Sequence, residues 1–242
     1  AAMLGDLATP EAIANLSEAL GLNDPLLVQY FRWVGGILKG DFGTSFFIKG
    51  NMLKILLDHL VPTLQLTTWS VLFATCIAVP LGIVAAIKRG RAPDQVISMF
   101  SIFGISVPSF LLGLGLILLF AVKLELLPSS GYRSIPEFGW ATHLRYMALP
   151  SIALGFIEAA LMIRMTRSSM LEILGSDYIR MAKAKGVSRF KIFMKHALKN
   201  ALIGIVTVVG LAFMSLLAGA TVTESVFNIP GIGKLTLNSV MR

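Results

Sequence analysis

The chain has 242 residues, of which 55% are hydrophobic and only 14% are charged, and its mean hydropathy is +0.78. A soluble domain usually carries about 25% charged residues, so most of this surface is too apolar to face water and must be covered by lipid. The composition therefore excludes soluble, disordered, collagen-like and disulfide-rich proteins. The single cysteine, Cys76, also excludes an intrachain disulfide and a cysteine-based metal cage.

Residues 1–61 are predicted to lie outside the membrane and to contain two amphipathic helices. Thr9 is the expected N-cap of the first helix, with Pro10 at its first position and Gly21 at its end. The second helix is expected to begin after Asp24 and Pro25 and to end near Gly40. Its apolar stripe at helical spacing comprises Leu27, Tyr30, Phe31, Val34, Ile37 and Leu38.

A third amphipathic stretch, residues 52–60, leads into the first of four segments that are long and apolar enough to cross a bilayer. The predicted spans are residues 62–87, 96–122, 147–166 and 200–222. In the first span, small side chains recur every fourth residue and predict a helix contact face: Ala74, Ala78, Gly82 and Ala86. In the second span, Pro108 predicts a kink, which belongs either to a bent packing helix or to a transport hinge.

The basic residues predict how the chain crosses the membrane. Nine Lys and Arg residues lie between Arg164 and Lys199, with only Glu172 and Asp177 opposing them, and the loop after the first span is also basic. The positive-inside rule places both loops in the cytoplasm, which accounts for the charge better than nucleic-acid binding does. Residues 1–61, the loop 123–146 and the tail 223–242 are then outside, and residues 1–61 have four basic against six acidic residues.

The basic loop 167–199 has a helical pattern in addition to the positive charge that a cytoplasmic loop needs. Its pattern predicts a helix, a break at Gly186 and a second helix capped by Ser188. One face of the second helix is expected to be buried, through Phe190, Phe193, Met194 and Ala197. Such an elbow suits a membrane protein that receives force from a soluble partner, whereas a solvated topological loop requires only charge.

Three stretches carry a family resemblance. Asp177-Tyr178-x-Arg180-x-Ala182-x-Ala184-Lys185-Gly186 resembles the cytoplasmic "EAA" loop of ABC-importer permeases. Arg180 and Met181 depart from the general motif, which has Glu and Ala there, and these departures favour the dipeptide, oligopeptide, glutathione and nickel branch. The segment from Leu20 to Ser45, and Glu224-x-Val-Phe227-x-x-Pro230-Gly231-x-Gly233, resemble the same branch, and Arg164, Arg167 and Ser168 also fit it.

The resemblance implies an all-α, polytopic helical membrane protein with the type I ABC importer transmembrane fold. It implies a permease subunit in a bacterial or archaeal cytoplasmic (inner) membrane that forms half of the translocation path for peptides, glutathione-like solutes or nickel complexes. The implied partners are membrane lipid, a second homologous permease subunit, two ATPase subunits that bind ATP and Mg, and an extracytoplasmic substrate-binding protein. No cofactor and no nucleic acid are expected for this chain. Such permeases usually have six spans, so the first and the last are expected to be missing from this sequence.

The resemblance also implies which residues couple the permease to its ATPases. They are Asp177, Tyr178, Arg180, Ala182, Ala184, Lys185, Gly186, Val187, Ser188 and Arg189. ATP hydrolysis is expected in the partner subunits, and no catalytic constellation in this chain points to an enzyme.

Glu158 leads to the main alternative, because an ionisable side chain inside a span should face the protein interior or a watery path. It is assigned to a candidate substrate path together with Ser106 and Pro108. In an ion-coupled secondary transporter, Glu158 would instead be the coupling carboxylate. The structural alternative is a carboxylate satisfied near the cytoplasmic interface by Arg164, and both Arg164 and Arg167 are interpreted as interface anchors.

Two further signals are weak. Residues 230–234 resemble the end of a phosphate-binding loop, but Leu235 replaces the required Ser or Thr and Asn228 replaces the first Gly. The two histidines predicted near the outer face, His59 and His143, are too few to define a nickel site.

Overall fold

The computed structural model describes residues 9–11, 14, 17, 23–45 and 50–241. The chain divides into two compact units, residues 1–58 and residues 59–242, and each is described by itself.

The first unit contains the predicted amphipathic helices. Helix is assigned from Pro10, as expected, whereas the expected stop at Gly21 lies outside the described residues. Helix α2 spans Leu26–Leu38, has Pro25 at its N-cap, and is followed by Gly40 with a φ of 81°, which glycine adopts without strain. Two short antiparallel strands follow, β1 (Thr44–Ser45) and β2 (Gly50–Asn51), with Thr44 opposite Asn51.

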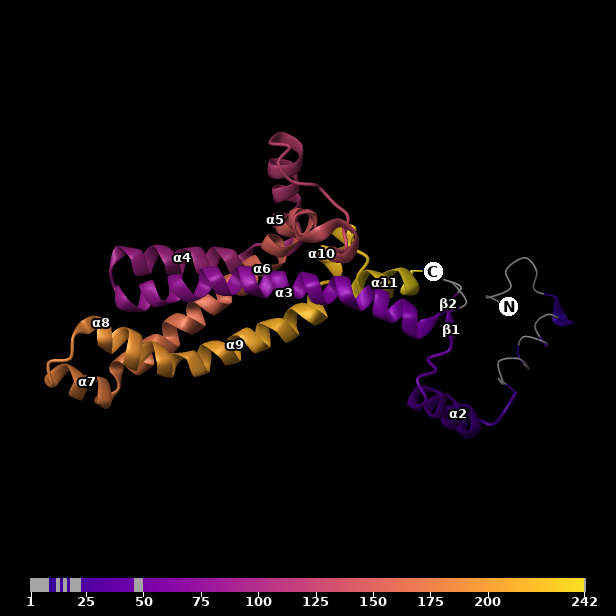
Figure 1. The fold of residues 1–242 in the computed structure, drawn as a ribbon, viewed down its shortest axis with the longest axis horizontal. Helices are drawn as coiled ribbons and strands as arrows, with labels where there is room; N and C mark the ends of the chain where they lie inside the picture. The colour runs from indigo at the N-terminus through magenta and orange to yellow at the C-terminus, as the bar shows by residue number, and fades with distance from the viewer. Residues whose placement is uncertain (1–8, 12–13, 15–16, 18–22, 46–49, 242) are drawn as a thin grey trace. The chain divides into compact units, whose positions relative to one another are not determined.

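The second unit consists of helices joined by turns and loops, with no strand among its described residues (Figure 1). Its elements, together with the start of α3 in the first unit, are α3 (Met52–Ile87), α4 (Ala92–Ser106), α5 (Ser109–Leu116), η2 (Ile117–Lys123), α6 (Ile135–Gly175), α7 (Asp177–Ala184), α8 (Arg189–Lys191), η3 (Ile192–Ala197), α9 (Leu198–Gly219), α10 (Thr221–Val226) and α11 (Ile232–Val240). Three stretches are long and apolar enough to cross a membrane: Met52–Ile87, Ile135–Gly175 and Lys195–Gly219. The bent pair Ala92–Ser106 and Ser109–Lys123 passes the same test when it is taken together. The predicted all-α membrane fold is confirmed.

The break at Pro108 is sharper than the predicted kink. The two halves of the bent pair differ in direction by 99°, and Val107 and Pro108 both have extended backbone between them. Proline lacks the N–H that would continue the helix and restricts the preceding residue to extended conformations. The structure therefore has two helices here and not one bent helix.

α3 and α6 are longer than the apolar segments that predicted them. α6 extends beyond residues 147–166 at both ends, because polar residues continue the helix where hydropathy falls, and it is interrupted near its start by Gly139, which has a φ of 76° and a ψ of 168°. The limits of the membrane-spanning segments and of the three predicted regions, 1–61, 62–222 and 223–242, stay predictions.

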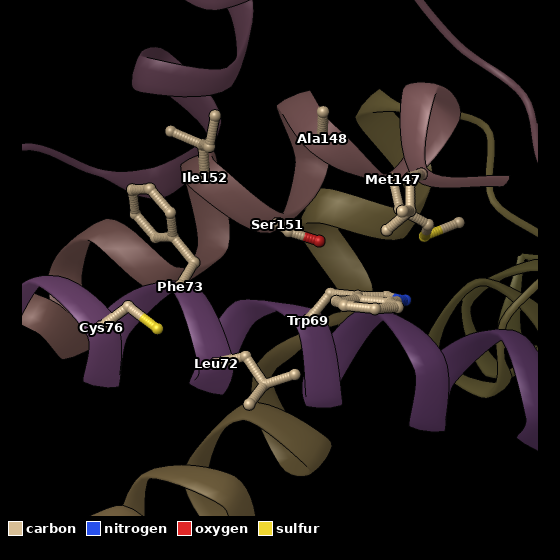
Figure 2. A pocket seen from close by; sticks show the side chains of 9 residues that line it. Trp69, Leu72, Phe73, Cys76, Met147, Ala148, Ser151 and Ile152 are labelled. Carbon is tan, nitrogen blue, oxygen red and sulfur yellow. The ribbon is translucent and has the colours of Figure 1, made fainter. Parts of the chain in front are cut away.

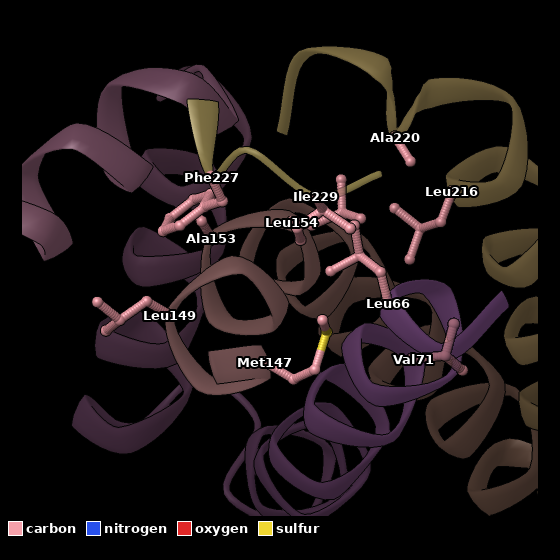
Figure 3. Close-up of a cluster of buried hydrophobic side chains, with 10 residues drawn as sticks. All are labelled: Leu66, Val71, Met147, Leu149, Ala153, Leu154, Leu216, Ala220, Phe227 and Ile229. Carbon is pink, nitrogen blue, oxygen red and sulfur yellow. The ribbon is translucent and has the colours of Figure 1, made fainter. Parts of the chain in front are cut away.

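The helices pack through two kinds of contact. At one end, large apolar side chains from α3, α6, α9 and the segment after α10 form a buried cluster (Figure 3): Leu66, Val71, Met147, Leu149, Ala153, Leu154, Leu216, Ala220, Phe227 and Ile229. Along the middle, the small residues predicted as a contact face on α3 are all buried. A Cβ at Gly82 would lie 2.6 Å from the Cβ of Thr166 on α6, so the backbones approach too closely for any side chain there.

Candidate functional site

The elbow predicted around Gly186 is present. Helix α7 ends in a Schellman motif, in which the N–H of Gly186 donates to the carbonyl of Lys183 (3.0 Å) and the N–H of Val187 donates to that of Ala182 (3.2 Å). Gly186 has a φ of 73°, in the left-handed region that disfavours side chains. Only a residue without a Cβ reverses the chain here at low cost, which confirms the predicted break.

Two side chains of α7 hold it against the rest of the second unit. Ile179 is fully buried, and the hydroxyl of Tyr178 accepts a hydrogen bond of 2.7 Å from Nδ2 of Asn200 on α9. The Tyr178 hydroxyl also lies 3.4 Å from the carbonyl oxygen of His196. Tyr178 therefore fixes the orientation of α7 on α9, a role that its place in the motif did not reveal.

The other face of α7 is exposed and mixes cations with apolar surface. Met181 is 59% exposed on α7, and Phe190, just beyond the elbow, is 73% exposed. Asp177 and Arg180 form an ion pair at 3.4 Å, but both are exposed, so the pair contributes little to stability. Large apolar side chains at the centre of a charged surface are typical of protein interfaces.

The predicted buried face after the elbow is partly wrong. Phe190 is exposed and Ile192 is buried in its place, while Ala197 is buried as expected. Residues 192–197 form a π-helical turn, and its wider spacing moves the buried positions away from those that an α-helical period predicts. The side chain of Met194 lies outside the described part of the structure.

The remaining elbow residues predicted to couple the chain lie around this turn. Ala182 and Ala184 are in α7, Lys185 caps it, and the carbonyl of Ser188 accepts the first helical hydrogen bond, from Ile192 (3.0 Å). Of Arg189 the structure describes only the backbone, which lies in α8.

A partly buried ion pair joins α4 to α6. Arg167 on α6 donates two hydrogen bonds to Asp94 on α4, Nε to Oδ1 at 2.6 Å and Nη2 to Oδ2 at 2.8 Å. Asp94 is only 4% exposed, and its Oδ2 also accepts from the N–H of Gly90 at 2.9 Å. A bidentate pair thus joins Arg167 to α4, while its interpretation as a membrane-interface anchor stays a prediction. Arg164 is exposed.

The far end of the unit carries a second buried carboxylate. Glu224 on α10 is fully buried; its Oε1 accepts from the Thr63 hydroxyl on α3 (2.6 Å) and its Oε2 from the N–H of Lys234 on α11 (2.9 Å). The Thr63 hydroxyl oxygen in turn accepts from the N–H of Ile232 (2.9 Å). The carboxylate thus satisfies the N-terminus of α11 and joins three helices.

This network explains the glycines that resemble a phosphate-binding loop. A Cβ at Gly231 would overlap the Glu224 carboxylate, and one at Gly233 would overlap the Thr221 side chain. Gly231 therefore makes room for a carboxylate of the same chain, and Gly233 makes room for the Thr221 side chain.

The three residues assigned to a substrate path have different surroundings. Glu158 is 9% exposed, and Ser215 on α9 is the polar group beside it. Ser106 and Pro108 are exposed at the break between α4 and α5, where the Ser106 hydroxyl donates to the carbonyl of Ile102 (3.0 Å). None of the described hydrogen bonds or ion pairs connects the three, and none pairs Glu158 with Arg164. The substrate path stays a prediction.

His143 has a structural role. It is fully buried, its Nδ1 donates to the carbonyl of Arg133 (2.7 Å), and its Nε2 accepts from Nε1 of Trp69 (3.3 Å). Within the described ranges, no three His, Cys, Asp or Glu side chains are grouped so that they could hold a metal ion.

An apolar pocket of about 380 Å³ lies between α3 and α6 (Figure 2). Trp69, Phe73 and Ile152 are among the side chains that line it, and the only hydroxyl is that of Ser151, which is buried without a hydrogen-bond partner. Such a lining suits apolar groups and not a charged solute.

Comparison with known proteins decides the family. Residues 78–242 match the model of the binding-protein-dependent transport system inner membrane component, and residues 1–67 match the model of the N-terminal region of such membrane components. The chain belongs to this family. Its members act with ATPase subunits, which hydrolyse the ATP, and with a substrate-binding protein, so the secondary-transporter alternative is set aside. Membership also confirms the predicted inner-membrane location.

Individual relatives of the family match over most of their length. The chain is 40% identical to a probable peptide ABC transporter permease of Sinorhizobium fredii (99% of this chain, 76% of the relative). It is 41% identical to the glutathione transport system permease GsiC of Salmonella paratyphi A (98% and 74%) and 37% identical to the dipeptide transport system permease DppB of Escherichia coli K12 (97% and 76%). A crystal structure of an amino acid ABC transporter with histidines has the same fold, with a TM-score of 0.51 at 17% identity over 78% of this chain and 79% of that one.

Proposed function

We propose that this chain forms half of the translocation path of an ATP-driven importer for short peptides or peptide-like solutes such as glutathione. A second, similar permease subunit completes the path, and two ATPase subunits bind at the elbow around Gly186. The end of the unit that carries α7 faces the cytoplasm, and the end that carries α10 and α11 faces outward.

The cargo assignment is supported by the names of the relatives. Proteins that are 37–41% identical over nearly the whole chain are named as peptide, dipeptide and glutathione permeases. These solutes share peptide bonds and a free carboxylate, which defines the chemical class.

The coupling assignment is supported mainly by the arrangement of α7. One face is fixed by Ile179 and Tyr178, and the other exposes Met181 among basic residues. The Tyr178–Asn200 hydrogen bond ties α7 to α9, so a displacement of the exposed face of α7 would reach that helix. ATP-driven closure of the ATPases would then be passed to α9 through α7.

The decisive experiment is reconstitution of the complete transporter in proteoliposomes, with the binding protein on the outer side. We expect ATP-dependent uptake of labelled dialanine or glutathione. Uptake of nickel salts without uptake of either peptide would contradict the cargo assignment.

The elbow is tested separately by capture of the ATPase subunits from detergent solution. Met181→Asp and Phe190→Asp should each weaken capture about tenfold or more, because apolar residues at the centre of an interface carry most of its binding energy. Leu126→Asp is the matched control, since Leu126 is 58% exposed and belongs to the loop between η2 and α6. Equal capture by all three variants would place the ATPase contact elsewhere.

A further inference from the structure

A polar pocket of about 480 Å³ opens at the end of the unit opposite to α7. It lies between the loop before α6 and the turn that joins α10 to α11. Its lining residues are Ser130, Gly131, Tyr132, Arg133, Tyr146, Asn228, Pro230 and Lys234. Two of them are cations and none is acidic, so the pocket carries positive charge that no lining residue neutralises.

Arg133 is held in place before any ligand arrives. Its guanidinium carbon lies 4.6 Å from the ring centre of Phe138 and 5.6 Å from that of Tyr146, and its carbonyl oxygen is bound by the buried His143. Aromatic rings attract a guanidinium while leaving its N–H groups free to donate. Arg133 forms no ion pair with any residue that the structure describes. A guanidinium that is held in place and has no ion-pair partner is suited to binding a carboxylate through two N–H groups.

Lys234 supplies the second cation from the first turn of α11. A positive charge is unfavourable at a helix N-terminus, so the helix itself does not favour a lysine there. Its Nζ donates to Oδ1 of Asn228, whose φ of 53° is in the left-handed region. Glu224 is buried and does not line the pocket, and its Oε2 accepts from the backbone N–H of Lys234.

Tyr132 contributes no negative charge. Burial, and to a lesser extent the charge of Glu137, raises the pKa of the Tyr132 hydroxyl above its ordinary value. That hydroxyl donates a hydrogen bond to Oε1 of Gln65 at 2.7 Å, so it is protonated and already has a partner.

We infer that this pocket binds the free carboxylate of the transported solute, through Arg133 and Lys234, at the outer entrance of the permease. The inference rests on the proposed function, because it takes the solute to be a peptide with a free C-terminus. The volume admits the terminal residues of a short peptide, and the two cations face the solute before it enters the apolar part of the helix bundle.

The test measures binding without the binding protein, which could impose its own selectivity. The complete permease–ATPase complex is placed in lipid nanodiscs and titrated with dialanine or with dialanine amide, and binding is followed by saturation-transfer NMR. The wild-type complex should bind dialanine about tenfold more tightly than the amide, because a charge-assisted hydrogen bond is lost with the carboxylate. Arg133→Gln and Lys234→Gln should each reduce or abolish this preference and leave amide binding unchanged.

Arg145→Gln is the matched control, since Arg145 lies on the same end of α6 but does not line the pocket. It should keep the preference, and Arg133→Lys should keep part of it. Equal loss of dialanine and amide in Arg133→Gln would show a structural role and overturn the inference. It is also overturned if Arg133→Gln weakens capture of the binding protein while dialanine binding is unchanged.

Different results would contradict the carboxylate pocket and the peptide function. Normal ATP-driven uptake of dialanine by a wild-type complex that binds acid and amide equally would overturn only the carboxylate pocket. A complex that neither binds nor transports dialanine would overturn the peptide function as well.

Discussion

At each end of the helical unit a helix is followed by a residue with positive φ, Gly186 after α7 and Asn228 after α10. The contacts that stabilise the two ends are different. At the elbow, α7 is held by one buried side chain, Ile179, and by exposed hydrogen bonds of the Tyr178 hydroxyl with Asn200 and with the carbonyl of His196. At the other end, α10 and α11 are joined through Glu224, which is fully buried and bonded to Thr63 and to the backbone of Lys234. The elbow is therefore held by few contacts, whereas a buried hydrogen-bond network joins the helices at the far end.

The difference fits the role proposed for each end. A buried polar network is costly to break, since each unpaired buried group loses about 1–3 kcal/mol, so the far end keeps one arrangement. A helix held by few contacts leaves most of its surface for a partner and can be displaced by it. Substitutions at the far end should therefore affect folding, and those at the elbow should affect coupling.

The largest effect is expected at Gly231. Gly231→Ala places a Cβ on the Glu224 carboxylate, which must then leave its partners on α3 and α11. We expect a loss of several kcal/mol, by the usual cost of breaking a buried polar network, and a large fall in the yield of folded permease in fluorescence-detected size exclusion. Gly210→Ala is the control, because a Cβ there meets nothing within 4 Å. Equal yields for the two variants would show that the network is dispensable.

The next largest effect is expected at the ion pair between α4 and α6. Asp94→Ala leaves the partly buried Arg167 without its partner, and breaking such a pair costs about 3 kcal/mol. A double-mutant cycle of Asp94→Ala and Arg167→Ala, followed by thermal unfolding in detergent, should give a coupling of about 1 kcal/mol or more. Additive effects would mean that the two side chains do not stabilise each other.

Gly186→Val should cost about 1–2 kcal/mol locally, because a side chain at a φ of 73° is strained. The permease should still fold, since a Cβ there meets nothing within 4 Å, while ATPase capture and ATP-driven uptake are lost. Lys199→Gln, at the edge of the loop, is the control for charge. Full capture and uptake by Gly186→Val would reduce the elbow to a topological loop.

Tyr178→Phe should have the smallest effect. It removes the hydroxyl bonded to Asn200 but keeps the ring, at a cost of about 1 kcal/mol. We expect normal folding and ATPase binding with a lower ratio of solute transported to ATP hydrolysed, because α7 follows the ATPase but is less firmly joined to α9. An unchanged ratio would show that Ile179 alone holds the helix.

The sequence by itself determined the features that depend on local composition. Hydropathy and charge gave a helical membrane protein, Gly186 gave the end of α7, and the spacing of small residues gave the contact face around Gly82. The motifs gave the family, which the comparison confirmed. Each of these features depends on residues that are close together in the sequence, so it can be predicted from the sequence alone.

Only the tertiary structure decided which distant groups meet. Thr63 and Glu224 are 161 positions apart, and Asp94 and Arg167 are 73 apart, so no periodicity connects them. The π-helical turn after the elbow changed which face is buried, because its spacing differs from the α-helical period that sequence reasoning assumes. The pocket around Arg133 and Lys234 likewise exists because α10 and α11 fold back on the loop before α6, where the N–H of Gly131 donates to the carbonyl of Phe227 at 2.7 Å.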